Sequence, residues 1–183
     1  MDNASDDYIA IFGHSMGCYI AYCVARLMIS ESDIGSRLTH LFLAGNHAPH
    51  LNLDTTHKTE FYRIDEQELK YHLIEYGGTL SGIIENKAAN AFFLPIIRND
   101  YYITETHSIT TIEPLPCSIS VLNGIDDALS SLDLESWKGY TTQRFEVVNF
   151  PGNHFFVQQQ SELIIQYVSN TINKYKLTNW RPQ

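Results

Sequence analysis

The residue types that can activate a serine nucleophile occur in this 183-residue sequence at Ser15, Asp127 and His154. A serine hydroxyl is a poor nucleophile until a histidine takes its proton and a carboxylate orients that histidine. Ser15 is the centre of a G-x-S-x-G pentapeptide at 13–17, and the aspartate and then the histidine follow it along the chain. One class of serine hydrolases has this chain order, whereas others carry the same three residue types in a different order. The pattern predicts catalysis through a covalent acyl-serine.

The residues around Ser15 predict the local structure that such a nucleophile needs. Residues 8–12 form a short apolar run that predicts a buried strand, and the apolar stretch 18–28 predicts a buried helix. A strand, a G-x-S-x-G turn and a helix form a nucleophile elbow, in which the small residues let the strand and the helix pack closely. The backbone N–H of Met16 is the expected donor to the oxyanion. The alternative is that Ser15 lies in an ordinary glycine-flanked turn.

The acid and the base each have rivals in the sequence. Asp126 is adjacent to Asp127 and could orient the histidine instead, although the spacing from Gly124 favours Asp127. His14 lies inside the elbow, where its side chain would point in another direction, so we expect a structural role for it. Five other histidines are expected at the surface, namely His47, His50, His57, His72 and His107. The position of His154 after the last predicted strand makes it the expected base.

Further apolar runs predict the sheet that would bring these residues together. Strands are expected at 38–44, 117–122 and 144–150, and helices at 132–137 and 161–176. A helix between two strands predicts a right-handed parallel crossover, so the expected fold class is α/β with a mostly parallel sheet. Functional groups gather at the carboxyl ends of parallel strands. Because Asp127 and His154 both follow predicted strands, the sheet would place them at the same end.

Residues from about 54 to 108 are rich in charge and tyrosine and have helical rather than strand periodicity. Three helical stretches are expected there: one from the capping-box pattern Asp65-x-x-Glu68 to Gly77-Gly78, one at 90–94 that Pro95 breaks or kinks, and one at 97–106. We interpret the insertion as a helical lid over the site, within a single domain of residues 1–183. A helical elaboration without a gating role is the alternative.

Composition and charge exclude several classes of function. A net charge of −9 without a basic stripe argues against a nucleic-acid binder. No apolar run is long enough to span a membrane and no signal peptide is visible, so we expect a cytoplasmic protein. The cysteines, Cys18, Cys23 and Cys117, are odd in number and lack metal-ligand spacing, and no histidine pair carries a supporting glutamate. Neither a disulfide framework nor a metal site is expected.

The motifs of this chain resemble those of type II thioesterases, the free-standing editing enzymes of nonribosomal peptide and polyketide synthesis, which have the α/β-hydrolase fold. The similarity begins with the elbow GHSMG and its helix CYIAYCVARLM, and it extends in the family's order over nearly the whole chain. It includes HLFLAG at 40–45 with APH at 48–50, YGGT at 76–79, PIIRND at 95–100, PLPCSISVLNGIDD at 114–127, Trp137 before Thr141-Thr142, and FPGNHFF at 150–156.

The resemblance implies a serine thioesterase with Ser15, Asp127 and His154 as its catalytic triad. Its substrates would be acyl groups on the phosphopantetheine arm of acyl or peptidyl carrier proteins, and it would need no cofactor of its own. Related enzymes release medium-chain acids from fatty acid synthase, so fatty acid synthesis is a further implied setting. Two alternatives stay open: an esterase or lipase acting on small oxygen esters, and an inactive remnant that only binds carrier protein.

The chain departs from that family near its N-terminus. Similar proteins place several strands and helices before the nucleophile strand, whereas here that strand is expected at 8–12. The preceding part would supply the second oxyanion N–H and a neighbour for the first strand. We therefore expect an N-terminally truncated α/β-hydrolase fold with an unpaired apolar strand edge, and weak or no activity for residues 1–183 alone.

Overall fold

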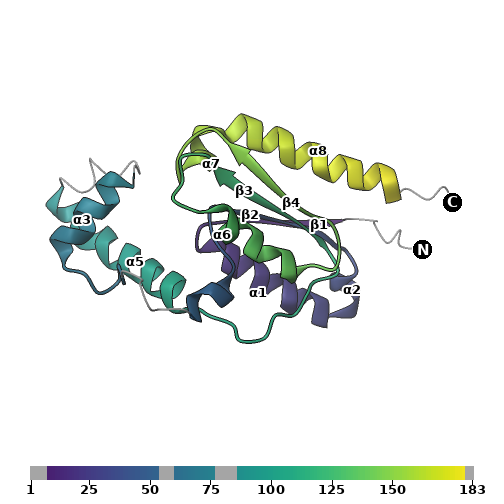
Figure 1. Ribbon diagram of the computed structural model, residues 1–183, viewed down its shortest axis with the longest axis horizontal. Coiled ribbons are helices and arrows are strands. Elements are labelled where there is room, and N and C mark those ends of the chain that lie inside the picture. The colour runs from purple at the N-terminus through teal and green to yellow at the C-terminus, as the bar shows by residue number, and fades with distance from the viewer. Residues whose placement is uncertain (1–7, 54–59, 77–85, 180–183) are drawn as a thin grey trace.

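The computed structural model describes residues 8–53, 60–76 and 86–179, and its centre is a parallel sheet (Figure 1). Four strands cross the sheet in chain order: β1 (Ile9–His14), β2 (Leu38–Ala44), β3 (Ser118–Gly124) and β4 (Phe145–Phe150). Each neighbouring pair is parallel. The predicted parallel α/β sheet is therefore confirmed, and each strand lies within a residue or two of its expected bounds.

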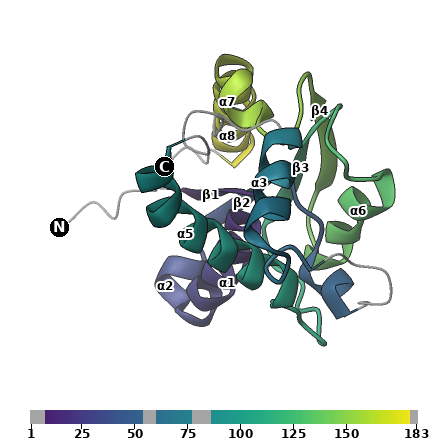
Figure 2. The ribbon, with the colours of Figure 1, turned by 90° about the vertical axis from the view of Figure 1, so that its left-hand side faces the viewer.

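Helices cover both faces of the sheet (Figures 1 and 2). One face carries α1 (Gly17–Ser30), the short α2 (Ser32–Gly35), α6 (Ser131–Glu135) and the 3-10 helix η2 (Ser136–Tyr140), and the other carries α7 (Phe156–Gln159) and α8 (Ser161–Asn179). Leu41 and Leu43 of β2 pack in the core beneath α1, whereas Phe42 and Ala44 pack in the core beneath α8. Because both faces are buried, every residue of β2 is buried, and apart from Thr39 and His40 the strand is apolar. Among the described helices, none is long and apolar enough to cross a membrane.

The insertion between β2 and β3 is helical, as predicted. It contains the 3-10 helix η1 (Pro49–Leu53), α3 (Glu66–Glu75) and α5 (Lys87–Thr106). Asp65 caps α3 by accepting the Glu68 N–H at 2.9 Å, which confirms the capping signal. The expected stop at Gly77-Gly78 lies outside the described residues. We refer to α3 and α5 as the lid helices; the name describes their position in the insertion, and a gating role stays a prediction.

Helix α5 corrects one prediction from the sequence. We expected Pro95 to separate two helical stretches, but α5 continues through it from Lys87 to Thr106. Proline removes one backbone hydrogen bond from a helix, here the bond to the carbonyl of Ala91. Pro95 and Ala91 are both exposed, so water can hydrate that carbonyl and the helix is not forced to end.

A hydrogen-bonded chain of polar side chains crosses the sheet beneath α8. His40 Nε2 lies 2.8 Å from Ser120 Oγ, which donates to Glu146 Oε1 at 3.0 Å. Tyr167 of α8 donates to the same carboxylate oxygen at 2.6 Å, and Arg144 donates to the other oxygen at 2.7 Å. Burial lowers the pKa of His40 to about 4; the Glu146 carboxylate opposes this shift and the Arg144 guanidinium adds to it. His40 is therefore neutral in the folded protein at pH 7.

We expect the free energy of unfolding to fall as the pH drops from about 6.5 towards 4, with His40 contributing at most about 3 kcal/mol of the change. The histidine pKa is near 6.5 in the unfolded chain and lower in the folded protein, so the unfolded chain binds the extra proton in this window. Urea denaturation at pH 4.5 and pH 7 measures the difference. His40→Gln should reduce it. An unchanged difference would assign the effect to other titrating groups, among them His14 and His72, whose pKa values are also lowered by burial.

Candidate active site

The turn between β1 and α1 holds Ser15 in a strained backbone conformation. Its φ is 55°, and no other described non-glycine residue has a positive φ. The Ser15 N–H donates to the Ala44 carbonyl at 2.8 Å, while its own carbonyl accepts the Cys18 N–H at 3.0 Å and Asn46 Nδ2 at 3.0 Å. These bonds to β2, α1 and the loop after β2 hold the strained residue in place. The strand, sharp turn and helix predicted around Ser15 are therefore confirmed.

The two glycines of the pentapeptide differ in what surrounds them. A Cβ added to Gly13 would lie 2.2 Å from the carbonyl oxygen of Gly17, so β1 and α1 approach too closely there for any side chain. A Cβ added to Gly17 would meet no atom within 4 Å. The expected need for a small residue holds at Gly13 but not at Gly17.

Replacing Gly13 with alanine should lower the free energy of unfolding by at least about 2 kcal/mol, because the overlap with backbone can be relieved only by moving α1 away from β1. Gly17→Ala is the matched control. It should leave the free energy of unfolding unchanged or raise it by up to about 1 kcal/mol, because alanine has a higher helix propensity than glycine. Urea denaturation of both variants measures the effect, and equal midpoints would contradict the packing argument.

Asp127 and His154 lie close together in the loops that follow two adjacent strands. Asp127 is in the loop after β3, and His154 is in the loop after β4. The Nδ1 atom of His154 lies 3.0 Å from Asp127 Oδ2. The Asp127 side chain is 1% exposed and that of His154 is 10% exposed, so the pair is largely shielded from water. Asp126, the rival acid, is exposed and lies outside this contact. A carboxylate at Nδ1 keeps the proton on that nitrogen and leaves Nε2 free to accept one from a serine.

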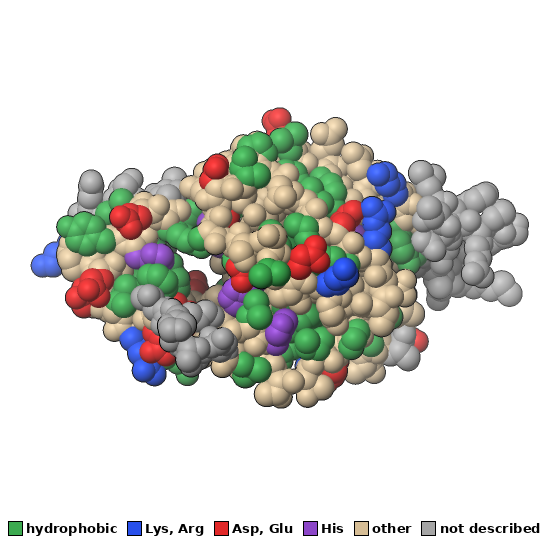
Figure 3. All heavy atoms as spheres, viewed as in Figure 1, with side chains coloured by type: hydrophobic (Ala, Val, Ile, Leu, Met, Phe, Trp, Pro, Cys, Tyr) green, Lys and Arg blue, Asp and Glu red, His purple; other side chains and the backbone are tan. Residues whose placement is uncertain are grey.

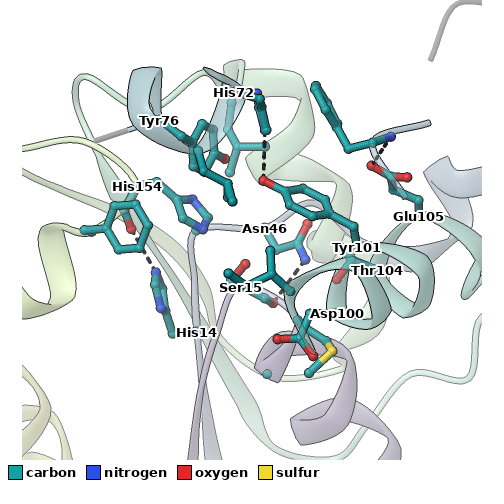
Figure 4. Close-up of a pocket in the computed structure, with 18 of the residues that line it drawn as sticks. His14, Ser15, Asn46, His72, Tyr76, Asp100, Tyr101, Thr104, Glu105 and His154 are labelled. Carbon is teal, nitrogen blue, oxygen red and sulfur yellow. Dashed lines mark hydrogen bonds between the residues drawn. The ribbon is translucent and has the colours of Figure 1, made fainter. Parts of the chain in front are cut away.

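A cavity of about 500 Å³ opens beside this pair, between the lid helices and the carboxyl ends of the strands. The space-filling view shows the molecule hollowed between the two parts (Figure 3). Ser15 and His154 line the cavity together, and the close-up shows their side chains facing the same space (Figure 4). Met16 also lines it. The backbone hydrogen bonds described for the elbow leave the Met16 N–H unused, as an oxyanion donor requires.

The lid helices contribute one wall of the cavity. The ring of Tyr76, the cap residue of α3, lies 4.8 Å from the His154 ring. Burial, with a smaller effect of the Asp127 charge, raises the pKa of Tyr76 to about 12. His72 Nε2 lies 2.8 Å from the Tyr101 hydroxyl and links α3 to α5 across this wall. Two apolar side chains of the lid helices, Leu73 and Ile97, complete it.

Two carboxylates also lie in the wall formed by α5. The oxygens of Glu105 accept the N–H groups of Phe61 and Tyr62 at 3.1 and 3.4 Å, so this residue anchors the segment that leads into α3. Asp100 faces the same cavity, and loss of solvent raises its pKa above the ordinary value. Within the described parts of the chain, no group of three or more His, Cys, Asp or Glu could hold a metal ion.

Several cavity residues were missed or misplaced by the sequence analysis. His47 and His72 line the cavity and His50 and His107 are half-buried, whereas all four were expected at the surface; His57 lies outside the described residues. Tyr76 and Asn46 had no role assigned to them. For Tyr76 the only available signal was its place in the YGGT motif, whereas Asn46 lies between the motifs at 40–45 and 48–50 and had none.

A family model described as Thioesterase domain matches residues 2–172. The chain belongs to the thioesterase family. The human medium-chain S-acyl fatty acid synthase thioesterase is 29% identical over 185 residues, covering 96% of this chain and 66% of the relative. The gramicidin S biosynthesis protein GrsT of Aneurinibacillus migulanus is 27% identical, covering 87% of this chain and 60% of GrsT. The chain thus spans about three fifths to two thirds of the length of these relatives.

A solved structure has a similar fold. ClbQ, from the colibactin pathway of nonribosomal peptide and polyketide synthesis, superimposes with a TM-score of 0.82 at 26% identity. The match covers 97% of the thioesterase chain and 73% of ClbQ. Together with the parallel sheet, this establishes the α/β-hydrolase-like fold that the resemblance implied.

Proposed function

We propose that this chain forms the catalytic centre of a serine thioesterase that hydrolyses acyl groups from the phosphopantetheine arm of carrier proteins. The observation that supports it best is a strained Ser15 in the same cavity as the Asp127–His154 pair. The relatives are named for nonribosomal peptide, polyketide and fatty acid synthesis, and we propose the same setting for this protein. It would act in the cytoplasm and use no cofactor of its own.

In the acylation step, the Ser15 hydroxyl attacks the thioester carbonyl carbon and gives its proton to His154 Nε2. Asp127 stabilises the imidazolium that forms, and the Met16 N–H donates to the oxyanion. The carbon–sulfur bond then breaks, and the departing thiolate takes the proton from His154. A thiolate leaves more readily than an alkoxide, so the demand on His154 as an acid is modest.

In the deacylation step, a water molecule takes the place of the thiol. His154 accepts its proton while the oxygen attacks the acyl-serine. The ester bond to Ser15 breaks, the serine recovers its proton from His154, and the free acid leaves. The apolar wall of Leu73, Ile97 and Tyr101 would hold the acyl group during both steps.

The carrier protein would dock against the lid helices. Helix α5 exposes Phe92, Ile96 and Ile103, and exposed apolar residues grouped on one element are typical of docking surfaces. Carrier proteins are usually acidic and this chain carries a net charge of −9, so apolar contacts rather than charge attraction would hold the two together.

The test compares three substrates at one acyl chain length: the acyl-phosphopantetheinyl carrier protein, acyl-CoA and the p-nitrophenyl ester. We expect the highest kcat/KM for the carrier-bound thioester. The Ser15→Ala variant measures the background rate that does not depend on the nucleophile. A preference for the p-nitrophenyl ester would overturn the proposal in favour of an esterase. Saturable binding of the loaded carrier without turnover would identify a binding remnant.

A further inference from the structure

His14, the last residue of β1, reaches across the site to the loop that carries the base. Its Nε2 atom lies 2.8 Å from the backbone carbonyl oxygen of His154. Their rings are 5.0 Å apart at an interplanar angle of 37°. Figure 4 shows this bond beside Ser15. We infer that His14 is a positioning residue, which sets the distance between the nucleophile and the base of the proposed reaction.

The acceptor in this bond fixes the protonation of His14. A carbonyl oxygen can only accept, so Nε2 must carry a proton. Burial lowers the pKa of His14; its bond to the His154 carbonyl and the charge of Asp127 oppose the shift, and the His154 ring adds to it. His14 is therefore the neutral Nε2–H tautomer at pH 7. A neutral neighbour matters because His154 becomes cationic when it takes the serine proton, and a second cation 5 Å away would oppose that transfer.

His14 controls a part of the base that Asp127 does not. Asp127 holds the ring through Nδ1, whereas His14 holds the main chain of the same residue. Because His14 is adjacent to Ser15, its bond joins the two reacting residues through one short covalent link and one hydrogen bond. The link between Ser15 and His154 by way of Asp127 is less direct, because Asp127 is attached to the end of strand β3.

The rings of His14 and His154 lie side by side over Gly45, the residue after β2. A Cβ added to Gly45 would meet His14 Nε2 and the Cε1 and Nδ1 atoms of His154 at 3.4 Å, an ordinary van der Waals distance. Phe156 of α7 packs edge-on against the His14 ring, 6.2 Å between centroids. The His14 ring therefore lies between the rings of Phe156 and His154, so we expect a change at His14 to displace His154.

The experiment measures the rate constant for covalent labelling of Ser15 by a fluorophosphonate, which needs neither carrier protein nor acyl group. His14→Phe keeps a ring but removes the donor, and we expect labelling to slow by about 10- to 100-fold, the effect of a misplacement of about 1 Å. His14→Gln places an amide N–H near the position of Nε2 and cannot titrate. It should label within about threefold of the wild type, with an unchanged pH profile.

The thioesterase assay gives a second readout. In His14→Phe we expect kcat to fall with KM nearly unchanged, since the acyl and carrier contacts lie elsewhere. The downfield proton signal of the His154 Nδ1–H should persist in His14→Gln and broaden in His14→Phe, which tests positioning even if that variant is less stable.

Three results would overturn the inference. Labelling of His14→Phe at the wild-type rate would show that His14 does not position His154. Equal slowing in His14→Gln and His14→Phe would mean that the imidazole itself takes part in the chemistry. Absence of labelling in the folded wild type would mean that residues 1–183 alone do not assemble a reactive Ser15, and this inference would fall together with the proposed function. Loss of only the His14 effect would leave the proposed function intact.

Discussion

Replacing Ser15 with alanine is expected to lower kcat/KM for acyl thioester hydrolysis by at least about 10⁴-fold, to the level left by the oxyanion donor and binding alone. No acyl-enzyme can form without the hydroxyl, and His154 would have only water to activate. The fold should persist, because Ser15 is held through its backbone N–H and carbonyl rather than through its side chain. Thermal unfolding of the variant should match that of the wild type.

Fluorophosphonate labelling followed by intact-mass measurement isolates the nucleophile from substrate preference. The wild type should gain a single adduct, and Ser15→Ala should gain none. Ser169→Ala is a suitable control because Ser169 is exposed on α8, away from the residues that line the cavity. An adduct that persists in Ser15→Ala would show that a different residue is the nucleophile.

Replacing Asp127 with asparagine should lower kcat by about 10⁴-fold, the effect known for the equivalent change in a serine protease triad. The amide can donate to His154 Nδ1, which favours the tautomer that holds its proton on Nε2 and so cannot accept one from Ser15. It also removes the charge that stabilises the imidazolium. The 3.0 Å contact and the 1% exposure of the Asp127 side chain leave little room for water to substitute for it.

Asp126→Asn is the matched control, because it makes the same chemical change one residue away. Asp126 is exposed and lies outside the contact with His154, so kcat should stay within about twofold of the wild type. Steady-state rates on one acyl thioester compare the two variants. Equal losses would show that either carboxylate can orient the base, which would reverse the assignment of the acid.

The sequence was informative where one residue's neighbours in the chain decide its environment. The run from Leu38 to Ala44 predicted β2 because a strand buried on both faces is mostly apolar on both, and here only Thr39 and His40 are polar. Asp65 and Glu68 predicted the start of α3 because capping is a contact between residues three apart. The turn at Ser15 could be predicted for the same reason.

Contacts between distant segments could not be predicted in this way. Nothing near Tyr76 indicates that its ring packs on His154, and nothing near His40 indicates that it bonds Ser120. Pro95 was expected to end a helix, as proline usually does. Helix α5 continues through it because the Ala91 carbonyl that loses its hydrogen bond is exposed to water. For the partner of His154, the spacing from Gly124 favoured Asp127 over Asp126, but only the structure shows which carboxylate the turn after β3 points inward.

The order of the strands has a consequence for how the chain acquires its site. Ser15 follows β1 at one side of the four described strands, and His154 follows β4 at the other, so the bond between His14 and His154 joins residues 140 positions apart. Pairings between such distant segments form slowly, because loop closure costs entropy before the contacts repay it. Helices α1 and α8 can form early, but the reactive serine exists only when the last strand has docked. Ser15 reactivity is therefore a kinetic marker for completion of the fold.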